Sequence, residues 1–349
     1  MPRVAIFGCG DAGELNFCGL KLAGFDPVVL CDEDPSVLQK THWAPKNVAR
    51  CTTKNVGTIY GSEDVDLVVV GTPDHTHLPV ASAALAAGKY VWVEKPLATA
   101  TQDIEMFAHL AHTYPGRLLF SETFTYQAQI QATILNLGEL GGLQGGQTSY
   151  TMWNCDRIMG GGKWRTETRY NPCAGGLSHN FMVLRLLAAS PFVRVCSRGQ
   201  VLTYHELGKH GGFDTMHGLL ETAAGQLFSW YICLATKGPN SPMAHRTAHF
   251  MLQFECGALI YGHEPEHDRL IVNGESAYFA QEAEAVSWRS YYKEICYRRM
   301  HEDTLRAMRG EPTLHTIWHG INVAAACASA FESAHQNGIW LDIPQVLQG

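Results

Sequence analysis

The sequence predicts an α/β protein of two domains, a parallel sheet with covering helices followed by an α+β domain with a mostly antiparallel sheet. Three observations lead to this prediction. Strand-like and helix-like segments alternate over the first third of the chain, a glycine cluster follows the first strand, and later apolar segments alternate as antiparallel strands do. The 349 residues suit two domains, which we place at residues 1–121 and 122–349.

The first domain is predicted from a repeated pattern of strand and helix. The expected strands are 3–7, 27–31, 65–70, 90–93 and 117–120, and the expected helices are 14–23, 78–87 and 101–111, with a helix and a connector between 36 and 62. The segment at 65–70 (VDLVVV) is a nearly continuous β-branched run, which is typical of a parallel strand covered on both faces. This alternation specifies right-handed crossovers.

The second domain shows a different pattern. We expect strands at 147–153, 193–204, 216–222, 226–234, 249–254 and 258–262, and helices at 127–137, 291–308 and 316–335. Strands in uninterrupted succession favour antiparallel pairing, with the helices on one side of the sheet.

Composition excludes several classes of partner. The net charge is −7 and the Lys and Arg residues are scattered, so we expect neither nucleic acid nor an anionic membrane as a partner. The longest apolar runs fall short of the roughly 20 residues of a membrane span. The first strand begins within three residues of Met1, which leaves no room for a secretory signal, and we expect a cytoplasmic protein. The eleven cysteines form no Cys-x-x-Cys pair, so we expect reduced thiols and no metal site.

The glycine cluster after the first strand has the spacing of a dinucleotide-binding turn. It reads Gly8, Cys9, Gly10, Asp11, Ala12, Gly13. In this Rossmann pattern Gly8 permits the tight turn, Gly10 lets a pyrophosphate approach the backbone, and Gly13 allows close helix packing. The helix that follows supplies amide groups and a partial positive charge at its amino end. The alternative is a similar turn that binds no dinucleotide.

The acidic residue at the end of the second strand favours NAD over NADP. Asp32 lies 24 positions after Gly8, where a carboxylate accepts both adenosine ribose hydroxyls and repels a 2′-phosphate. Glu33 and Asp34 follow it, and neither offers a cation to a phosphate. NAD is therefore the expected cofactor, and NADP the less favoured one.

Two further segments are more specific than the glycines. One is 71–77 (GTPDHTH), between a strand and a helix, and the other is Glu94-Lys95-Pro96 after the next strand. Here the sequence resembles the Gfo/Idh/MocA family of oxidoreductases, whose signature is Glu-Lys-Pro. The resemblance extends to the segments 121–126 (SETFTY), 163–165 (KWR) and 174–188 (AGGLSHNFMVLRLLA). It implies a Rossmann domain followed by an open-faced α/β substrate domain, and a homodimer or homotetramer formed through the open sheet face.

Lys95 is the first catalytic candidate. An ammonium beside an oxidised nicotinamide is disfavoured, so we expect its pKa to fall until it exchanges a proton with a substrate hydroxyl near neutral pH. Pro96 permits a cis peptide bond after it. The alternative is that Lys95 forms an ion pair with Glu94 or another carboxylate, as most lysines do.

His179 is the second catalytic candidate, because it lies near the family's active-site histidine in a helix that opens with two glycines. A neutral imidazole there shares proton transfer with Lys95 or orients the hydroxyl. The family often carries an aspartate four residues earlier, where this chain has Gly175. An alternative register places His179 at the aspartate position and Val183 at the histidine position, and a further alternative is a structural histidine at the start of a helix.

Other residues are assigned by position or by resemblance. Thr72, Pro73 and His75 leave the carboxyl end of a central strand and are expected to line the cofactor, together with Glu94. His77 is expected to pack against or cap the following helix. The predicted substrate contacts are Tyr126, Trp164, Arg165 and Asn180, since an aromatic face suits a sugar ring and a guanidinium suits hydroxyls or phosphate.

These residues predict an NAD-dependent oxidoreductase that interconverts a hydroxyl and a carbonyl on a sugar or cyclitol. Lys95 and His179 handle the proton while nicotinamide C4 exchanges hydride. Two alternatives stay open. One is an NAD-dependent glycosidase that acts by transient oxidation and elimination, and the other is a non-catalytic sensor of dinucleotide or sugar.

Overall fold

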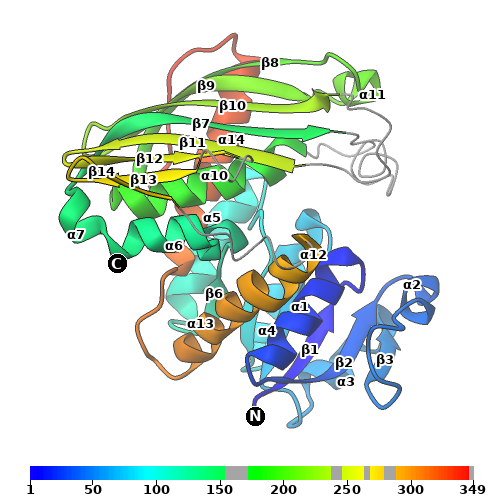
Figure 1. The fold of residues 1–349 in the computed structure, drawn as a ribbon. Helices are drawn as coiled ribbons and strands as arrows, with labels where there is room; N and C mark the ends of the chain where they lie inside the picture. Colours follow the sequence, from blue (N-terminus) through cyan, green and yellow to red (C-terminus); the bar gives the residue numbers. More distant parts are fainter. Residues whose placement is uncertain (154–171, 237–245, 263–267, 279–287, 346–349) are drawn as a thin grey trace. The chain divides into compact units, whose positions relative to one another are not determined.

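The computed structural model groups the chain into two compact units (Figure 1). Unit 1 consists of Met1–Gln127 and Glu282–Ile321, and unit 2 of Ala128–Gln281 and Asn322–Leu347. The residues that the structure describes are 1–153, 172–236, 246–262, 268–278 and 288–345. Each unit is built around its own sheet.

The sheet of unit 1 has six parallel strands in the order β3-β2-β1-β4-β5-β6. The strands are β1 (Arg3–Phe7), β2 (Asp26–Asp32), β3 (Ala49–Thr52), β4 (Leu67–Val70), β5 (Tyr90–Val93) and β6 (Leu118–Phe120). The side chains of Leu67–Val70 are fully buried, which confirms the prediction of a strand covered on both faces. The order changes direction between β1 and β4, where open α/β sheets bind ligands at the carboxyl ends of their strands.

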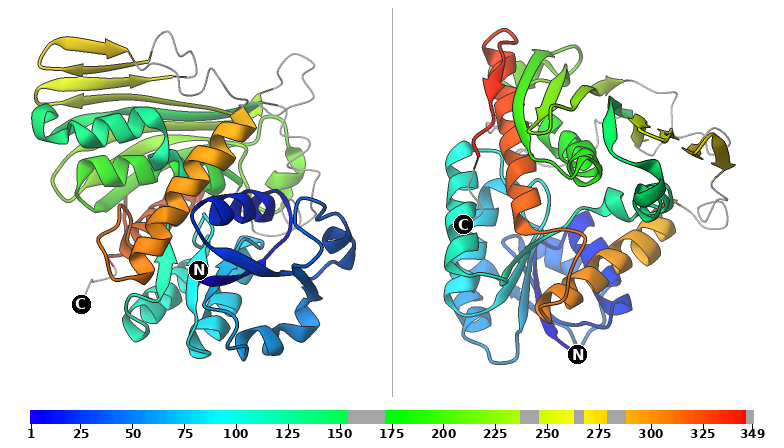
Figure 2. Two further views of the ribbon diagram at one scale, coloured as in Figure 1. Left: turned by 60° about the horizontal axis from the view of Figure 1, so that its bottom comes forward. Right: turned by 90° about the vertical axis from the view of Figure 1, so that its left-hand side faces the viewer.

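Helices cover both faces of this sheet, with α1 on one face and α4 and α5 on the other (Figure 2). Their bounds are α1 (Asp11–Leu22), α2 (Pro35–Gln39), α3 (Val56–Tyr60), α4 (His77–Ala86) and α5 (Thr101–Thr113), with the 3₁₀ turns η1 (Thr53–Asn55), η2 (Asp74–Thr76) and η3 (Thr123–Tyr126). The predicted parallel Rossmann domain is confirmed, and its predicted strands and longer helices differ from the observed ones by a few residues at their ends.

A segment from late in the chain packs onto this domain. It comprises α12 (Trp288–Tyr291), the π-helical segment η5 (Tyr292–Tyr297) and α13 (Arg298–Met308), and both η5 and α13 contact α1. The predicted division at residue 121 assigns these helices to the second domain, whereas their contacts place them in unit 1. The contact with α1 is very close, because a Cβ on Gly19 would lie 2.7 Å from Cβ of Tyr297 and 2.8 Å from its backbone carbonyl.

We expect Gly19→Ala to destabilise the protein. The added methyl overlaps backbone as well as side chain, and overpacking of this kind costs about 1–3 kcal/mol. Thermal unfolding monitored by circular dichroism measures the effect. Gly57→Ala is the matched control, because a Cβ on Gly57 in α3 meets no atom within 4 Å. Equal melting temperatures for the two variants would contradict the inferred close contact.

Unit 2 contains a nine-stranded mixed sheet in the order β14-β13-β12-β11-β7-β10-β9-β8-β15. Among the strands that the structure describes, β7 and β10 pair in parallel and the other neighbours are antiparallel, in agreement with the predicted mostly antiparallel sheet. The strands are β7 (Leu143–Trp153), β8 (Phe192–Gln200), β9 (Thr215–Thr222), β10 (Leu227–Thr236), β11 (Arg246–Phe254), β12 (Gly257–Tyr261), β13 (Arg269–Val272), β14 (Glu275–Tyr278) and β15 (Leu341–Asp342). The sequence patterns had predicted neither β13, β14 nor β15.

Two long helices cover one face of this sheet. They are α10 (Pro172–Ala188) and α14 (Ile317–His335), with α6 (Ala128–Leu135), α7 (Leu137–Leu140) and α11 (His205–Lys209) as shorter helices of the unit. Thr148 accepts a hydrogen bond from Asn180 of α10. Ser197 is aligned with Thr148 across the neighbouring strands and therefore lies on the same face of the sheet. Its hydroxyl donates to a carbonyl oxygen of α14. The other face leaves Leu227, Tyr231 and Met251 exposed. These exposed apolar side chains are consistent with the predicted open face.

Candidate functional site

The glycine cluster forms the turn between β1 and α1. Gly8 has a φ of +88°, and a Cβ on it would lie 2.4 Å from the carbonyl oxygen of Gly71. A Cβ on Gly13 would lie 2.2 Å from the carbonyl oxygen of Gly8, so α1 begins in backbone contact with the turn. Only glycine fits these two positions without movement of the backbone.

The space in front of the turn is open at Gly10. This residue is exposed, and a Cβ on it would meet no atom within 4 Å. Gly10 is the N-cap of α1 and has no side chain to bond the first amides of the helix. The amino end of α1 therefore offers unoccupied N–H donors and a partial positive charge to an anion.

Asp32 lies at the end of β2 beside this turn. Its Oδ2 accepts a hydrogen bond of 2.8 Å from the backbone N–H of Cys9, and its Oδ1 accepts one of 3.0 Å from that of Asp34. The carboxylate is half-buried. Each oxygen has further lone pairs, so the group can still accept hydrogen bonds from a diol.

The segment after β4 lies at the same edge of the sheet. Thr72 and Pro73 are half-buried, and His75 is exposed in η2. His77 is buried, with Nε2 2.9 Å from the carbonyl oxygen of Thr72 and Nδ1 3.2 Å from that of Leu97. Its position between the two segments fits the packing role expected for it.

Glu94 is buried at the carboxyl end of β5 and receives three hydrogen bonds. Oε1 accepts from Nδ2 of Asn16 at 3.0 Å and from the hydroxyl of Tyr297 at 3.2 Å, and Oε2 accepts from the backbone N–H of Lys95 at 3.0 Å. Burial raises the pKa of Glu94 and the charge of Glu122 adds to this, whereas Lys95 and the donated hydrogen bonds oppose it.

Lys95 is half-buried, and the peptide bond between Lys95 and Pro96 is cis, as the proline permits. Together with Lys95, the structure brings all the predicted cofactor residues to one edge of the sheet, at the ends of β1, β2, β4 and β5. They are Gly8, Cys9, Gly10, Asp11, Ala12, Gly13, Asp32, Thr72, Pro73, His75 and Glu94.

The second catalytic candidate belongs to unit 2. His179 is buried on α10, with its ring stacked on that of Tyr150 at a centroid distance of 6.0 Å. Its neighbour Asn180 donates a hydrogen bond of 2.7 Å to Oγ1 of Thr148. The sequence of α10 contains no acidic residue, so the carboxylate absent at Gly175 is not replaced from within this helix.

The remaining predicted substrate contacts fall elsewhere. Tyr126 is 4% exposed in unit 1, and its hydroxyl donates to Asp303 at 2.9 Å and lies 3.1 Å from the hydroxyl of Ser121. These contacts favour a packing role for Tyr126 over contact with a substrate. Trp164 and Arg165 lie outside the described residues.

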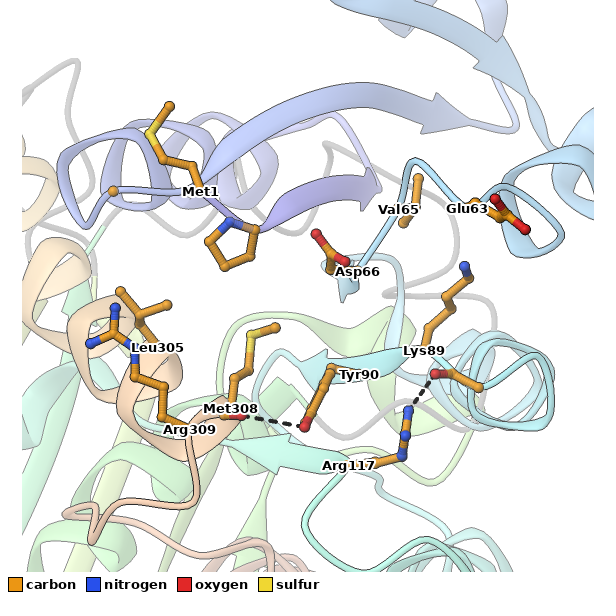
Figure 3. Close-up of a pocket in the computed structure, with 13 residues that line it drawn as sticks. Met1, Glu63, Val65, Asp66, Lys89, Tyr90, Arg117, Leu305, Met308 and Arg309 are labelled. Carbon is orange, nitrogen blue, oxygen red and sulfur yellow. Dashed lines mark hydrogen bonds between the residues drawn. The ribbon is translucent and has the colours of Figure 1, made fainter.

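A separate depression lies at the amino ends of the strands of unit 1 (Figure 3). Pro2, Asp66, Tyr90 and Met308 are among the residues that line it, and the Tyr90 hydroxyl donates to the carbonyl oxygen of Met308. None of the predicted site residues lines this depression. Because α/β sheets bind dinucleotides at the carboxyl ends of their strands, it is not the predicted site.

The described residues lack two features that would indicate another class of protein. Those residues contain no cluster of three or more His, Cys, Asp or Glu side chains that could hold a metal ion. None of the described helices is both long enough and apolar enough to cross a membrane.

Comparison with known families agrees with this geometry. Residues 2–121 match the model GFO_IDH_MocA, described as "Oxidoreductase family, NAD-binding Rossmann fold". The matched region covers the glycine turn, Asp32, the 71–77 segment and Glu94-Lys95-Pro96. Residues 2–121 thus match the Rossmann domain of the Gfo/Idh/MocA family.

Curated relatives match part of the chain. A "Glycosyl hydrolase family 109 protein" of Shewanella pealeana is 27% identical over 181 residues, which is 47% of this chain and 39% of that protein. The chain thus spans about two fifths of the length of this relative.

Solved structures resemble the whole chain in fold. Myo-inositol 2-dehydrogenase from Lactobacillus plantarum superposes with a TM-score of 0.78 at 17% identity, covering 99% of this chain and 100% of that one. An oxidoreductase from Agrobacterium radiobacter in complex with NAD+, L-tartaric acid and magnesium has a TM-score of 0.79 at 18% identity, covering 98% of each chain. Both units of the chain therefore have counterparts in these structures in fold.

The sequence analysis did not identify three residues around Glu94-Lys95-Pro96. Asn16 of α1 and Tyr297 of η5 both donate to Glu94, and His301 of α13 contacts Asn16. Tyr297 and His301 lie four positions apart in one predicted helix, a spacing that places them on one face. Nothing in the sequence pattern connects that face to Glu94, more than 200 residues earlier.

Proposed function

We propose that this protein is an NAD-dependent oxidoreductase that interconverts a hydroxyl and a carbonyl on a sugar or cyclitol. The observation that carries the proposal is one sheet edge that combines an open glycine turn, Asp32 and Lys95. The family match of this edge supports the cofactor, and the myo-inositol dehydrogenase and glycosyl hydrolase similarities support the substrate class.

The residues at this edge fit a dinucleotide. The open space at Gly10 and the uncapped amino end of α1 suit a pyrophosphate, and Asp32 suits the adenosine ribose hydroxyls. The segment of Thr72, Pro73 and His75 is proposed to line the nicotinamide ribose. A negative charge at Asp32 opposes a 2′-phosphate, so NAD is preferred over NADP.

The proposed chemistry divides between cofactor and protein. When bound, nicotinamide supplies the hydride acceptor or donor. Nζ of Lys95 takes the hydroxyl proton during oxidation and returns it during reduction. Glu94 holds the backbone N–H of Lys95, which limits the orientations of the lysine. We propose that His179 orients the reacting hydroxyl or shares its proton, with Asn180, Trp164 and Arg165 as substrate contacts.

Calorimetric titration with NAD and NADP tests the cofactor assignment, after the purified protein has been examined for bound dinucleotide. We expect NAD to bind clearly more tightly than NADP, and NADH to form when polyols are added. Absence of both binding and co-purified dinucleotide would remove the basis of the proposal and favour a sensor of another ligand.

Asp32→Asn is expected to weaken NAD binding and to narrow the preference for NAD over NADP. The variant loses the charge that repels the 2′-phosphate and one acceptor of the ribose hydroxyls, and hydrogen bonds to charged groups contribute about 1.5–3 kcal/mol. The ratio of the two dissociation constants measures the change. Asp34→Asn is the control, because it removes an equal charge from an exposed carboxylate that bonds Ser36. An equal change in both variants would contradict a specific role of Asp32.

Similarity to the glycosyl hydrolases favours one second candidate, a glycosidase that uses NAD transiently. In that reaction the cofactor returns to its starting state, so sugar is released from a glycoside without net NADH. Parallel assays of NADH absorbance and released reducing sugar separate the two functions. NADH that accumulates in proportion to product supports the oxidoreductase, and product without NADH supports the glycosidase.

A further inference from the structure

The carboxylate next to the proposed catalytic lysine is held from two different parts of the chain. Asn16 comes from the helix that begins at the glycine turn, and Tyr297 comes from η5, almost at the end of unit 1 in sequence. Both donate to Oε1 of Glu94, while Oε2 accepts the backbone N–H of Lys95. The two oxygens of the Glu94 carboxylate therefore connect Asn16 and Tyr297 to the backbone N–H of Lys95.

His301 fixes the direction of the hydrogen bonds. Burial lowers the pKa of His301 to about 3, so the imidazole is neutral at physiological pH and carries one N–H. Its Nε2 lies 2.8 Å from Oδ1 of Asn16. Because Oδ1 can only accept, Nε2 is the donor. Nδ2 of Asn16 is then directed to Glu94 and to the carbonyl oxygen of Ala12.

The structure of η5 and α13 indicates that Tyr297 and His301 are held in fixed positions. Residues Tyr292–Tyr297 are π-helical, a conformation that is rare and occurs frequently at functional sites. Gly19 allows Tyr297 to approach α1 to backbone distance, which brings the tyrosine hydroxyl to Glu94. The ring of His301 packs edge-on to that of Trp92 in β5, at a centroid distance of 5.2 Å.

We infer that Tyr297 and His301 are positioning residues for the proposed catalytic lysine, acting through Glu94 and Asn16. The inference rests on the proposed function, because it assigns Lys95 as the group that moves the proton. It adds that Tyr297 and His301, which the sequence places with the second domain, complete the lysine site of the Rossmann domain.

The first test compares Tyr297→Phe with Tyr292→Phe. Each removes one hydroxyl from a buried tyrosine of η5, but the Tyr292 hydroxyl accepts from Nε2 of Gln127 at 2.8 Å instead of contacting Glu94. We expect Tyr297→Phe to lower kcat roughly tenfold with little change in the dissociation constant of NAD, as the loss of one buried hydrogen bond predicts. Tyr292→Phe is expected to retain kcat while losing similar thermal stability.

The second test does not need turnover. The rate at which acetic anhydride labels Lys95, measured by mass spectrometry with Lys89 as internal reference, reports the environment of the lysine. We expect Tyr297→Phe to change this rate at least about twofold, because amine reactivity follows the local environment of the lysine, and Tyr292→Phe to leave it unchanged. His301→Leu should change it likewise, and His301→Gln, which retains a donor for Asn16, should restore it.

The outcomes separate the inference from the proposed function. If the wild-type protein shows no dehydrogenase turnover but Tyr297→Phe changes the labelling rate of Lys95, the proposed function is overturned and the positioning inference stands. Identical labelling of Lys95 in wild type, Tyr297→Phe and His301→Leu would overturn the positioning, whatever the activity. So would a kcat for Tyr297→Phe equal to that of Tyr292→Phe.

Discussion

Lys95→Met is expected to reduce turnover by about 10²–10⁴-fold, the usual contribution of a positioned general acid or base. The proposed reaction moves one proton at the hydroxyl whose carbon exchanges hydride, and a thioether cannot take that proton. Methionine is about as long as the aliphatic part of the lysine side chain, and the substitution leaves the glycine turn unchanged. NAD binding should therefore persist, which calorimetry measures alongside the steady-state rate.

Lys89→Met is the matched control for this experiment. Lys89 lies in the same unit at the amino edge of the sheet, where its Nζ donates to the carbonyl oxygen of Ser62. Its loss is expected to leave kcat unchanged, with a small effect on stability. Near wild-type turnover in Lys95→Met would refute the catalytic assignment. Loss of NAD binding together with turnover would show instead that Lys95 holds the cofactor.

The parallel domain was predictable because its signals are local. Every strand of unit 1 except the edge strand β3 (ARCT), which was not predicted, is an apolar run. Each conformational requirement of the turn falls on a glycine, as at Gly8, where φ is positive. Parallel strands end at one edge, so Asp32 and Lys95 could be assigned to the same site from their places after β2 and β5. Burial of β4 on both faces followed from its β-branched composition.

One of the elements that were not predicted depends on a distant contact. β15 is two residues long and pairs with β8 almost 150 residues earlier, which no local periodicity indicates. The same limit applies to the site. Glu94 was assigned with the cofactor residues, but its partners Asn16 and Tyr297 are selected by packing of α1 against η5. A helical pattern indicates which face is apolar and not which buried carboxylate that face will meet.

Gly10→Ala is expected to abolish tight NAD binding without unfolding the protein. The backbone at Gly10 has φ −76° and ψ −156°, which alanine accepts, and its Cβ would meet no atom within 4 Å. The methyl group would occupy the space in front of the amino end of α1. A displaced pyrophosphate loses one or more charge-assisted hydrogen bonds, so we expect the dissociation constant of NAD to rise about a hundredfold.

Gly13→Ala provides the contrast, because its Cβ would lie 2.2 Å from the carbonyl oxygen of Gly8. That variant must move α1 away from the turn, and it should lose thermal stability and NAD binding together. Melting temperature and calorimetric affinity, measured on both variants, therefore separate the two roles of the glycine turn. If Gly10→Ala bound NAD as tightly as wild type, the space at Gly10 would not be where the pyrophosphate lies, and the cofactor would have to enter by another part of the sheet edge.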